Sequence, residues 1–174
     1  MSCKSQHPGG LRLTDRAARL AGVTAGMRLL DIGCGDGVSL HFLAHKYEII
    51  PHGIDKYAPN FTVGDAANLP YPDKFFDAVI CECVLSLVGE RARAISEMHR
   101  VLQRDGVLIV SDICDKGNLG KLEAEFTVAG FGAVHFEEHR AALITYAAEM
   151  YGAKDTFCGN INNLTYYLLI CAKR

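Results

Sequence analysis

Residues 28–37 read RLLDIGCGDG, and this stretch decides the fold class. Its apolar first half predicts a buried strand over residues 28–32, and the residues after it have the period of a helix over 38–46. Gly33, Gly35 and Gly37 lie between the two. A Cβ in such a turn would block a positive φ or the approach of a ligand. The stretch therefore predicts a strand, a tight turn that presents backbone N–H groups to a ligand, and a helix.

The rest of the chain repeats this alternation of short apolar runs and segments of helical period, which is typical of βαβ units on a parallel sheet. We therefore predict an α/β fold, a doubly wound Rossmann-like sheet. Further strands are expected over residues 47–55, 60–63, 77–81, 107–113, 134–136 and 165–172, and further helices over 14–21, 90–103, 119–129 and 141–151.

Length and composition exclude several classes of protein. The 174 residues favour one domain over 1–174, with a flexible N-terminal arm over 1–13. A formal charge of −2 does not favour binding to nucleic acid or to an anionic membrane. Neither a signal peptide nor a membrane span is indicated, so we expect a cytoplasmic protein. Seven scattered cysteines without a C-x-x-C pair indicate reduced thiols and no metal site.

Acidic residues at the ends of three predicted strands indicate the ligand. Asp31 ends the first strand and Asp36 lies inside the glycine turn, where both would repel a pyrophosphate and attract an ammonium or sulfonium group. That favours S-adenosyl-L-methionine over NAD. Asp55 ends the second strand and can accept from two ribose hydroxyls; Asp65 ends the third and can accept from an adenine amino group. Singly, each of these residues is equally well explained as a cap or a turn former.

Four segments, LLDIGCGDG, HGIDK, GDAANLPYPDKFFDAVI and EMHRVLQRDGVLIVSDI, resemble the successive motifs of class I S-adenosylmethionine-dependent methyltransferases, in the subgroup similar to ubiquinone/menaquinone-biosynthesis methyltransferases. The resemblance covers about residues 14–113. It implies the strand order 3-2-1-4-5-7-6 with the last strand antiparallel. It also implies that the cofactor is bound by Asp31, Gly33, Cys34, Gly35, Asp55, Lys56, Asp65, Ala66, Cys81 and Glu82, with the residues at 81 and 82 forming the wall beside the sulfonium.

Two departures from the family are expected. Only nine residues separate Asp55 from Asp65, fewer than the roughly dozen that a parallel crossover needs, so the helix between strands 2 and 3 should be missing. The face that it would cover, with Tyr57 and Phe61, is then exposed or buried by a partner subunit or a second copy. The chain also lacks room for a lid between strands 5 and 6, which leaves residues 1–21 and 151–163 to cover the acceptor.

The catalytic residues stay unassigned, because a sulfonium methyl is already activated and a base is needed only if the acceptor loses a proton. Glu82 and Asp112 are weak candidates for that base, with Asp115, His135 and His139 behind them. The cysteines at 34, 81, 83 and 114 fall at the same predicted rim. They suit either ordinary packing or a soft metalloid acceptor, and packing is favoured.

Three functions from different classes fit this pattern. The first is a methyltransferase that acts on an unidentified small molecule. The second is an S-adenosylmethionine-binding subunit that is inactive or regulatory without a partner protein. The third is a nucleotide-binding oxidoreductase, which Asp31 opposes.

Overall fold

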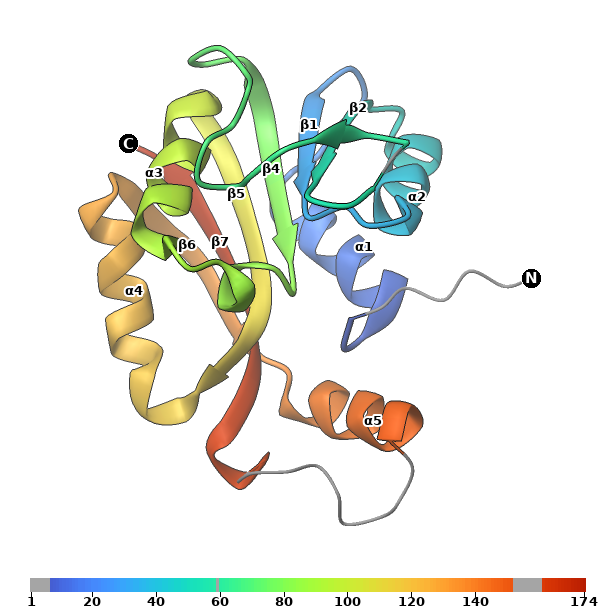
Figure 1. The fold of residues 1–174 in the computed structure, drawn as a ribbon, viewed down its shortest axis with the longest axis vertical. Coiled ribbons are helices and arrows are strands. Elements are labelled where there is room, and N and C mark those ends of the chain that lie inside the picture. The colour runs from blue at the N-terminus through green and yellow to red at the C-terminus, as the bar shows by residue number, and fades with distance from the viewer. Residues whose placement is uncertain (1–6, 59, 152–160) are drawn as a thin grey trace.

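The computed structural model describes residues 7–58, 60–151 and 161–174, and their strands form one mixed sheet of order β3-β2-β1-β4-β5-β7-β6 (Figure 1). This is the predicted order, and β7 is the antiparallel strand between β5 and β6. The strands are β1 (Arg28–Ile32), β2 (Ile50–Asp55), β3 (Thr62–Val63), β4 (Phe76–Glu82), β5 (Leu102–Asp115), β6 (Phe131–Glu138) and β7 (Leu164–Lys173).

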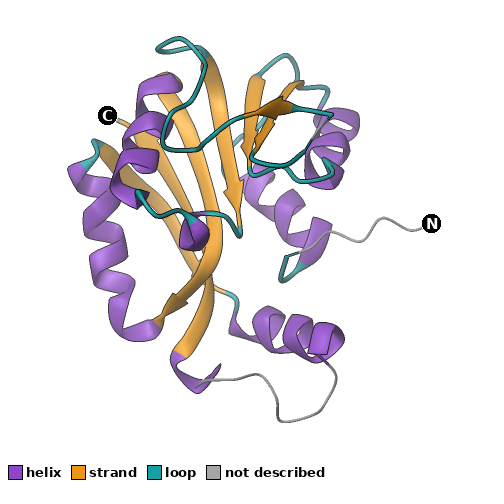
Figure 2. Cartoon of the chain, viewed as in Figure 1, coloured by secondary structure: helices purple, strands orange, loops and turns teal. Residues whose placement is uncertain are grey.

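Helices cover both faces of the sheet, as a doubly wound fold requires (Figure 2). On one face α3 and α4 bury one hydrophobic cluster against the sheet, and on the other α1, α2 and α5 bury a second. The five helices are α1 (Gly10–Leu20), α2 (Val38–Tyr47), α3 (Arg91–Val101), α4 (Leu119–Val128) and α5 (Arg140–Tyr151); short 3-10 turns are η1 (Leu85–Leu87), η2 (Lys116–Asn118) and η3 (Ile161–Asn163).

The parallel register brings the carboxyl ends of the central strands to one rim. In β1, Asp31 is level with Gly53 of β2 on one side and with Ile80 of β4 on the other. The residues that follow these positions therefore leave the sheet side by side, although they lie more than 20 residues apart in the sequence. This rim is where ligands bind in open α/β sheets.

The N-terminal helix begins at Gly10, four residues before the predicted start at Thr14. The predicted flexible arm is thus too long at its C-terminal end. Leu13 is 5 % exposed within the second hydrophobic cluster, and packing of this side chain outweighs the weak helix propensity of the two glycines before it. Residues 1–6 lie outside the described residues.

The crossover from β2 to β3 contains no helix in its described residues, 56–58 and 60–61, as the short spacing predicts. Part of the expectation for this face is wrong, because Phe61 is covered by its own chain. Its ring occupies the space beside two glycines: a Cβ on Gly37 would overlap the ring, and one on Gly53 would lie 2.6 Å from Phe61 Cδ1. Tyr57 is 88 % exposed.

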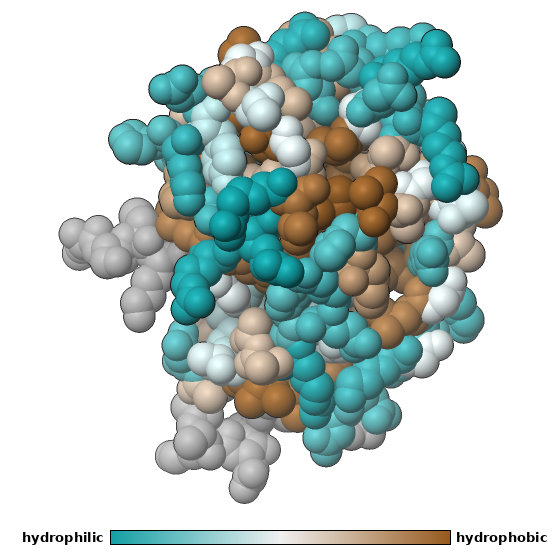
Figure 3. All heavy atoms as spheres, turned by 180° about the vertical axis from the view of Figure 1, so that it is seen from behind, coloured by the Kyte–Doolittle hydropathy of each residue, from teal (hydrophilic) through white to brown (hydrophobic). Residues whose placement is uncertain are grey.

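The reverse face of the molecule is chemically mixed. Figure 3 shows hydrophobic side chains gathered near the middle of this face and bordered by hydrophilic ones. Across the described residues, none of the helices is both long enough and apolar enough to cross a bilayer.

Candidate functional site

The turn after β1 is built around glycines that no other residue can replace without a change in the site. Gly33 has φ +74°, and a Cβ on it would overlap Val84 Cγ2. Gly35 has φ +52° and open space where its Cβ would point, and its N–H donates to Asp55 Oδ2 at 3.1 Å. The turn is therefore held to the end of β2, and the N–H groups of Gly33, Cys34 and Gly35 are used by acceptors of β2 and are not presented to a ligand as the sequence predicted.

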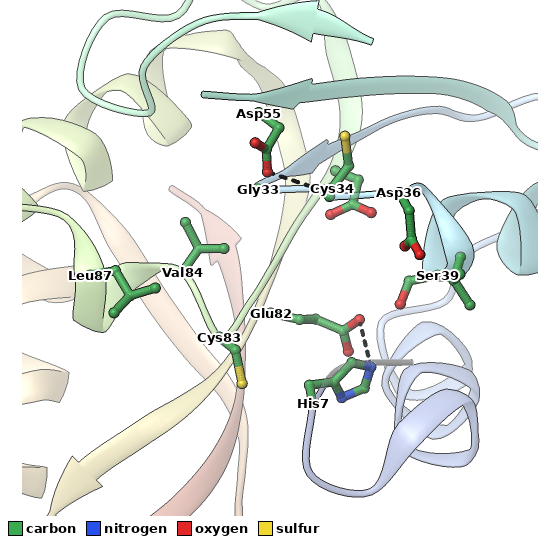
Figure 4. Close-up of a pocket in the computed structure, with 13 residues that line it drawn as sticks. His7, Gly33, Cys34, Asp36, Ser39, Asp55, Glu82, Cys83, Val84 and Leu87 are labelled. Atoms are coloured by element: carbon green, nitrogen blue, oxygen red, sulfur yellow. Dashed lines mark hydrogen bonds and ion pairs between the residues drawn. The ribbon is translucent and has the colours of Figure 1, made fainter. Parts of the chain in front are cut away.

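Two cavities of about 280 and 320 Å³ meet above this turn. Gly33, Asp55, Val84 and Leu87 line both of them. Figure 4 shows the first cavity, with Asp55 at one end and Glu82 and His7 at the other. The second cavity continues past Asp55 along the β2–β3 crossover. Together they form one elongated depression across the carboxyl ends of β1, β2 and β4, large enough for a small molecule.

Asp31 is the acidic centre of the first cavity. It is 4 % exposed, and no described residue donates a hydrogen bond to its carboxylate. Burial raises the pKa of Asp31 well above its ordinary range, and the nearby carboxylates of Glu82 and Asp55 raise it further. An ionised buried carboxylate without a donor is costly. Asp31 is therefore a strong site for a cation, and no described residue supplies one.

Asp55, at the end of β2, lies where the two cavities join. Asp55 accepts from the N–H groups of Gly35 and Tyr57, at 3.1 and 2.7 Å. These bonds fix its carboxylate at the end of β2 with acceptor sites still facing the depression. Lys56 lines the second cavity.

Asp65 differs from its expected position. Its carboxylate accepts from Ala67 N at 2.9 Å and pairs with Lys56 Nζ at 3.1 Å. The Ala67 N–H and then Lys56 lower the pKa of Asp65. The residues that line the second cavity here are its neighbours Gly64 and Ala66. Asp65 thus shapes the turn, and Ala66 is the residue of the pair in the position to touch a ligand.

Glu82, at the end of β4, is joined to the N-terminal segment. Both of its carboxylate oxygens lie 3.1 Å from Thr14 Oγ1, which donates, and Oε2 lies 3.3 Å from His7 Nε2. The side chains of His7 and Glu82 are each only 6 % exposed and both line the first cavity. Sequence reasoning missed His7 and Thr14, because nothing in their neighbourhood signals a contact with a residue about 70 positions away.

Cys81 was expected in the wall beside the sulfonium, and the structure places its side chain elsewhere. Its side chain is fully buried in the hydrophobic cluster under α3 and lines neither cavity. Glu82, the next residue of β4, is the member of this pair that lines the first cavity. Cys83 does line it, and its thiol lies 3.5 Å from Tyr166 Oη.

Cys34 keeps its predicted place in the turn and lines the first cavity. Burial, with Asp31 and Asp55 adding to it, raises the pKa of the Cys34 thiol to about 12, so the thiol stays protonated at neutral pH. Among the described residues, no cluster of three or more His, Cys, Asp or Glu side chains has an arrangement that would hold a metal ion.

Asp112 is not a base of this site. Its carboxylate accepts from Ser86 N at 2.8 Å and Ser86 Oγ at 2.7 Å, and it lines neither cavity. Burial raises its pKa, while the Ser86 bonds oppose that change. Asp112 therefore fixes the η1 turn that carries Leu87. Asp115, also named above as a candidate base, caps the next turn instead: its carboxylate accepts from Gly117 N at 2.7 Å.

The two histidines near the end of β6 also serve the scaffold. His135 Nε2 and His139 Nε2 lie 2.7 and 2.9 Å from the two oxygens of Glu137, which also binds Arg16 of α1. Neither histidine lines the first or the second cavity. Their cluster ties α1 to the far edge of the sheet.

Comparisons with known proteins agree with this geometry. Residues 30–110 match the family described as "Methyltransferase domain". A 27-O-demethylrifamycin SV methyltransferase from Amycolatopsis mediterranei is 32 % identical over 168 residues, which cover 83 % of this chain and 62 % of that protein. A solved phosphoethanolamine N-methyltransferase 2 from Haemonchus contortus, in complex with S-adenosyl-L-methionine, superposes with a TM-score of 0.77 at 16 % identity over 98 % of this chain and 54 % of its own.

The same fold also occurs in a protein with a different activity in its name. The [4+2]-cyclase SpnF superposes with a TM-score of 0.76 at 25 % identity, over 94 % of this chain and 80 % of its own. Fold alone therefore does not establish methyl transfer. The chain spans less than two thirds of the length of the curated relatives it matches first. Taken together, the matches support a class I methyltransferase domain with S-adenosyl-L-methionine as its cofactor; they do not confirm the ubiquinone/menaquinone subgroup.

Proposed function

We propose that this class I methyltransferase domain transfers a methyl group from S-adenosyl-L-methionine to a small-molecule acceptor by in-line displacement. The observation that carries the proposal is the Asp31 carboxylate, buried at the end of β1 beside the glycine turn and without a donor in the described part of the chain. A cationic ligand removes the cost of that burial, whereas a pyrophosphate would increase it.

The chemistry of the depression suits the whole cofactor. The carboxylate of Asp31 and the open space beside Gly35 fit an amino-acid end that carries an ammonium group. Asp55, which lines both cavities, has acceptor sites for ribose hydroxyls. The apolar side chains of Ile54, Ala66 and Val88 line the second cavity and fit an adenine ring. We therefore assign the first cavity to the methionine half and the second to the nucleoside half.

The cofactor supplies an activated methyl group, so the chain's task is to align the acceptor and exclude water. The residues in place to do so lie at the junction of the two cavities. Val84 and Leu87 line both cavities, and η1, which carries Leu87, is fixed by the Asp112–Ser86 hydrogen bonds. Leu87 is nonetheless 81 % exposed, so the junction is open enough to admit an acceptor.

A small molecule is the acceptor class that the relatives favour. The names of the first relatives refer to methylation of a rifamycin and of phosphoethanolamine, both small molecules. Neither relative favours the alternative of a cofactor-binding subunit without activity. Of the two candidate bases, only Glu82 lines the cavity, and it lies at the end remote from the junction.

The proposal is tested by incubating the purified chain with S-adenosylmethionine labelled in its methyl group and two acceptor panels, hydroxylated polyketides and small primary amines. We expect labelled product and S-adenosylhomocysteine to appear together with at least one panel. Gly33→Ala is the matched variant, since its Cβ would displace Val84 into the junction and should abolish both signals. Cofactor binding without product in either panel, or with a further panel of thiols and small acids, would contradict methyl transfer to a small molecule.

A further inference from the structure

We infer that His7, brought to the cavity by the N-terminal segment, determines specificity for the α-carboxylate of the cofactor's amino-acid end. This inference rests on the proposed function and goes beyond it by assigning a role to a residue outside the four motifs. The paired residue Glu82 supplies the opposite charge, so the two side chains together match a zwitterion.

His7 lies at the end of the depression that the amino-acid part of the cofactor would reach. Asp55 lines both cavities and therefore marks the ribose, with the nucleoside half on one side of it. Adenine and the methionine part of S-adenosylmethionine are attached on opposite sides of the ribose, so with adenine in the second cavity the amino-acid end extends away from Asp55 into the first. Figure 4 shows His7 and Glu82 at that far end, opposite Asp55.

Acidic side chains dominate the lining of the first cavity. The acidic residues that line the first cavity are Asp31, Asp36, Asp55 and Glu82. An α-ammonium group suits them, but an α-carboxylate is repelled by each of them. Among the described side chains that line this cavity, His7 is the single basic one. The carboxylate of the ligand therefore has one side chain with a complementary charge available to it.

The hydrogen-bond partners of the imidazole support a positive charge on His7. Its Nδ1 lies 3.2 Å from the Pro8 carbonyl oxygen, which can only accept. Its Nε2 lies 3.3 Å from Glu82 Oε2, another oxygen that only accepts when ionised, and 3.2 Å from the Thr14 hydroxyl. Both ring nitrogens thus lie within reach of acceptor oxygens, an arrangement that accommodates the imidazolium form.

The resulting arrangement is an ion pair that faces a zwitterion. With Glu82 and Asp31 on the ammonium side and His7 on the carboxylate side, each ligand charge meets its opposite at the end of the depression. Thr14 holds the Glu82 carboxylate from α1, so the N-terminal segment contributes two of the three residues in this network. Adenine thioethers that lack the amino-acid end would lose all of these contacts.

The test compares S-adenosylmethionine with its decarboxylated form, which keeps the sulfonium and the amine and lacks only the carboxylate. Binding of both to the full chain is measured by isothermal titration calorimetry for the wild type and for His7→Gln. Gln keeps an N–H donor near the Nε2 position but carries no charge. We expect the wild type to prefer the carboxylated ligand, and His7→Gln to bind it about tenfold more weakly, as for loss of one charge-assisted contact, with decarboxylated ligand affinity changed less than about twofold.

The outcomes separate this inference from the proposed function. A wild type that binds neither ligand contradicts the proposed function itself. A wild type that binds both ligands equally, or a His7→Gln variant that weakens both by the same factor, overturns the assignment of His7 alone. Glu82→Gln provides the reciprocal check: it should weaken both amine-bearing ligands and leave the affinity for 5′-methylthioadenosine, which has neither charged group, unchanged.

Discussion

Replacing Asp31 with Asn should make the protein more stable and its cofactor binding weaker. In the free protein the Asp31 carboxyl is buried, receives no hydrogen bond from any residue that the structure describes, and faces the charges of Glu82 and Asp55. Burial first, and then these charges, raise its pKa. Asn removes the charge, and its amide can donate to a neighbouring carboxylate. Relief of an unsatisfied buried group is worth about 1–3 kcal/mol. For a chain of this length that corresponds to an increase in melting temperature of about 2–12 °C.

The loss of affinity follows from the same carboxylate. A hydrogen bond from the ligand's ammonium group to an ionised Asp31 is worth about 1.5–3 kcal/mol, which is roughly a 10- to 150-fold change in the dissociation constant. Because Asp31 must be ionised to bind the ammonium group, wild-type affinity should rise as pH rises toward and through its raised pKa. Affinity of the Asn variant should not follow that dependence.

The stability difference also has a defined dependence on pH. The unfolded chain releases the Asp31 proton near the ordinary value of about 3.9, whereas the folded chain holds it to higher pH. Above pH 4 the folded state therefore binds more protons, and wild-type stability falls relative to the variant until the raised folded pKa is passed. Below pH 4 the difference is constant and small.

Thermal unfolding and titration with S-adenosylhomocysteine, each from pH 4 to 8, measure the two effects. Asp36→Asn is the control, since this carboxylate is exposed in the same turn and its loss should change stability by no more than about 0.5 kcal/mol. An Asp31→Asn variant that is less stable than the wild type, or that binds S-adenosylhomocysteine equally well, would refute the reasoning.

Three further predictions address the scaffold around the site. Gly33→Ala should lose about 1–2 kcal/mol of stability because of its positive φ, and more than tenfold in affinity for S-adenosylhomocysteine because the added Cβ overlaps a valine that lines the cavity. Gly22→Ala, the control, has the same backbone cost with open space around it and should bind S-adenosylhomocysteine normally. Phe61→Ala should lower the free energy of unfolding, measured in urea, by about 1–2 kcal/mol because the ring of Phe61 is half-buried. Tyr57 is exposed, so Tyr57→Ala should change only ligand binding. Equal stability of the two variants would contradict the packing of the Phe61 ring described above. Glu137→Gln should lower the free energy of unfolding by about 1 kcal/mol at neutral pH. Hydrogen bonding to Arg16 lowers the pKa of Glu137 to about 2, so the difference in stability between variant and wild type should shrink as pH falls from 4 to 2. A difference that stays constant over this range would argue against the ion-pair cluster.

The part of the site that sequence could predict is the part that local geometry controls. A strand that runs into Gly33 and Gly35 places Asp31 at a carboxyl end whatever the rest of the chain does, and the same holds for Asp55 at the end of β2. The absent helix between β2 and β3 followed from residue counting alone. These predictions depend on the number of residues between two strands and on the pattern of apolar residues and glycines in each strand and turn, and both can be read from short segments.

What could not be predicted depends on contacts between distant segments or on strand parity. His7 reaches Glu82 only because α1 packs beside the end of β4, and no local pattern encodes that approach. Cys81 was assigned to the cavity wall from the family motif, whereas the structure buries it in the hydrophobic cluster under α3. Asp112 was only a weak candidate for the base, and its structural role depends on Ser86, a partner that lies 26 residues away in the sequence.

The central claim is that the depression at the carboxyl ends of β1, β2 and β4 binds S-adenosylmethionine and its demethylated product. Titration calorimetry of the full chain with S-adenosylhomocysteine, and separately with NAD, tests it most directly. We predict saturable one-to-one binding of S-adenosylhomocysteine and no measurable heat with NAD. Binding of NAD in the absence of any response to S-adenosylhomocysteine would contradict the assignment of this site.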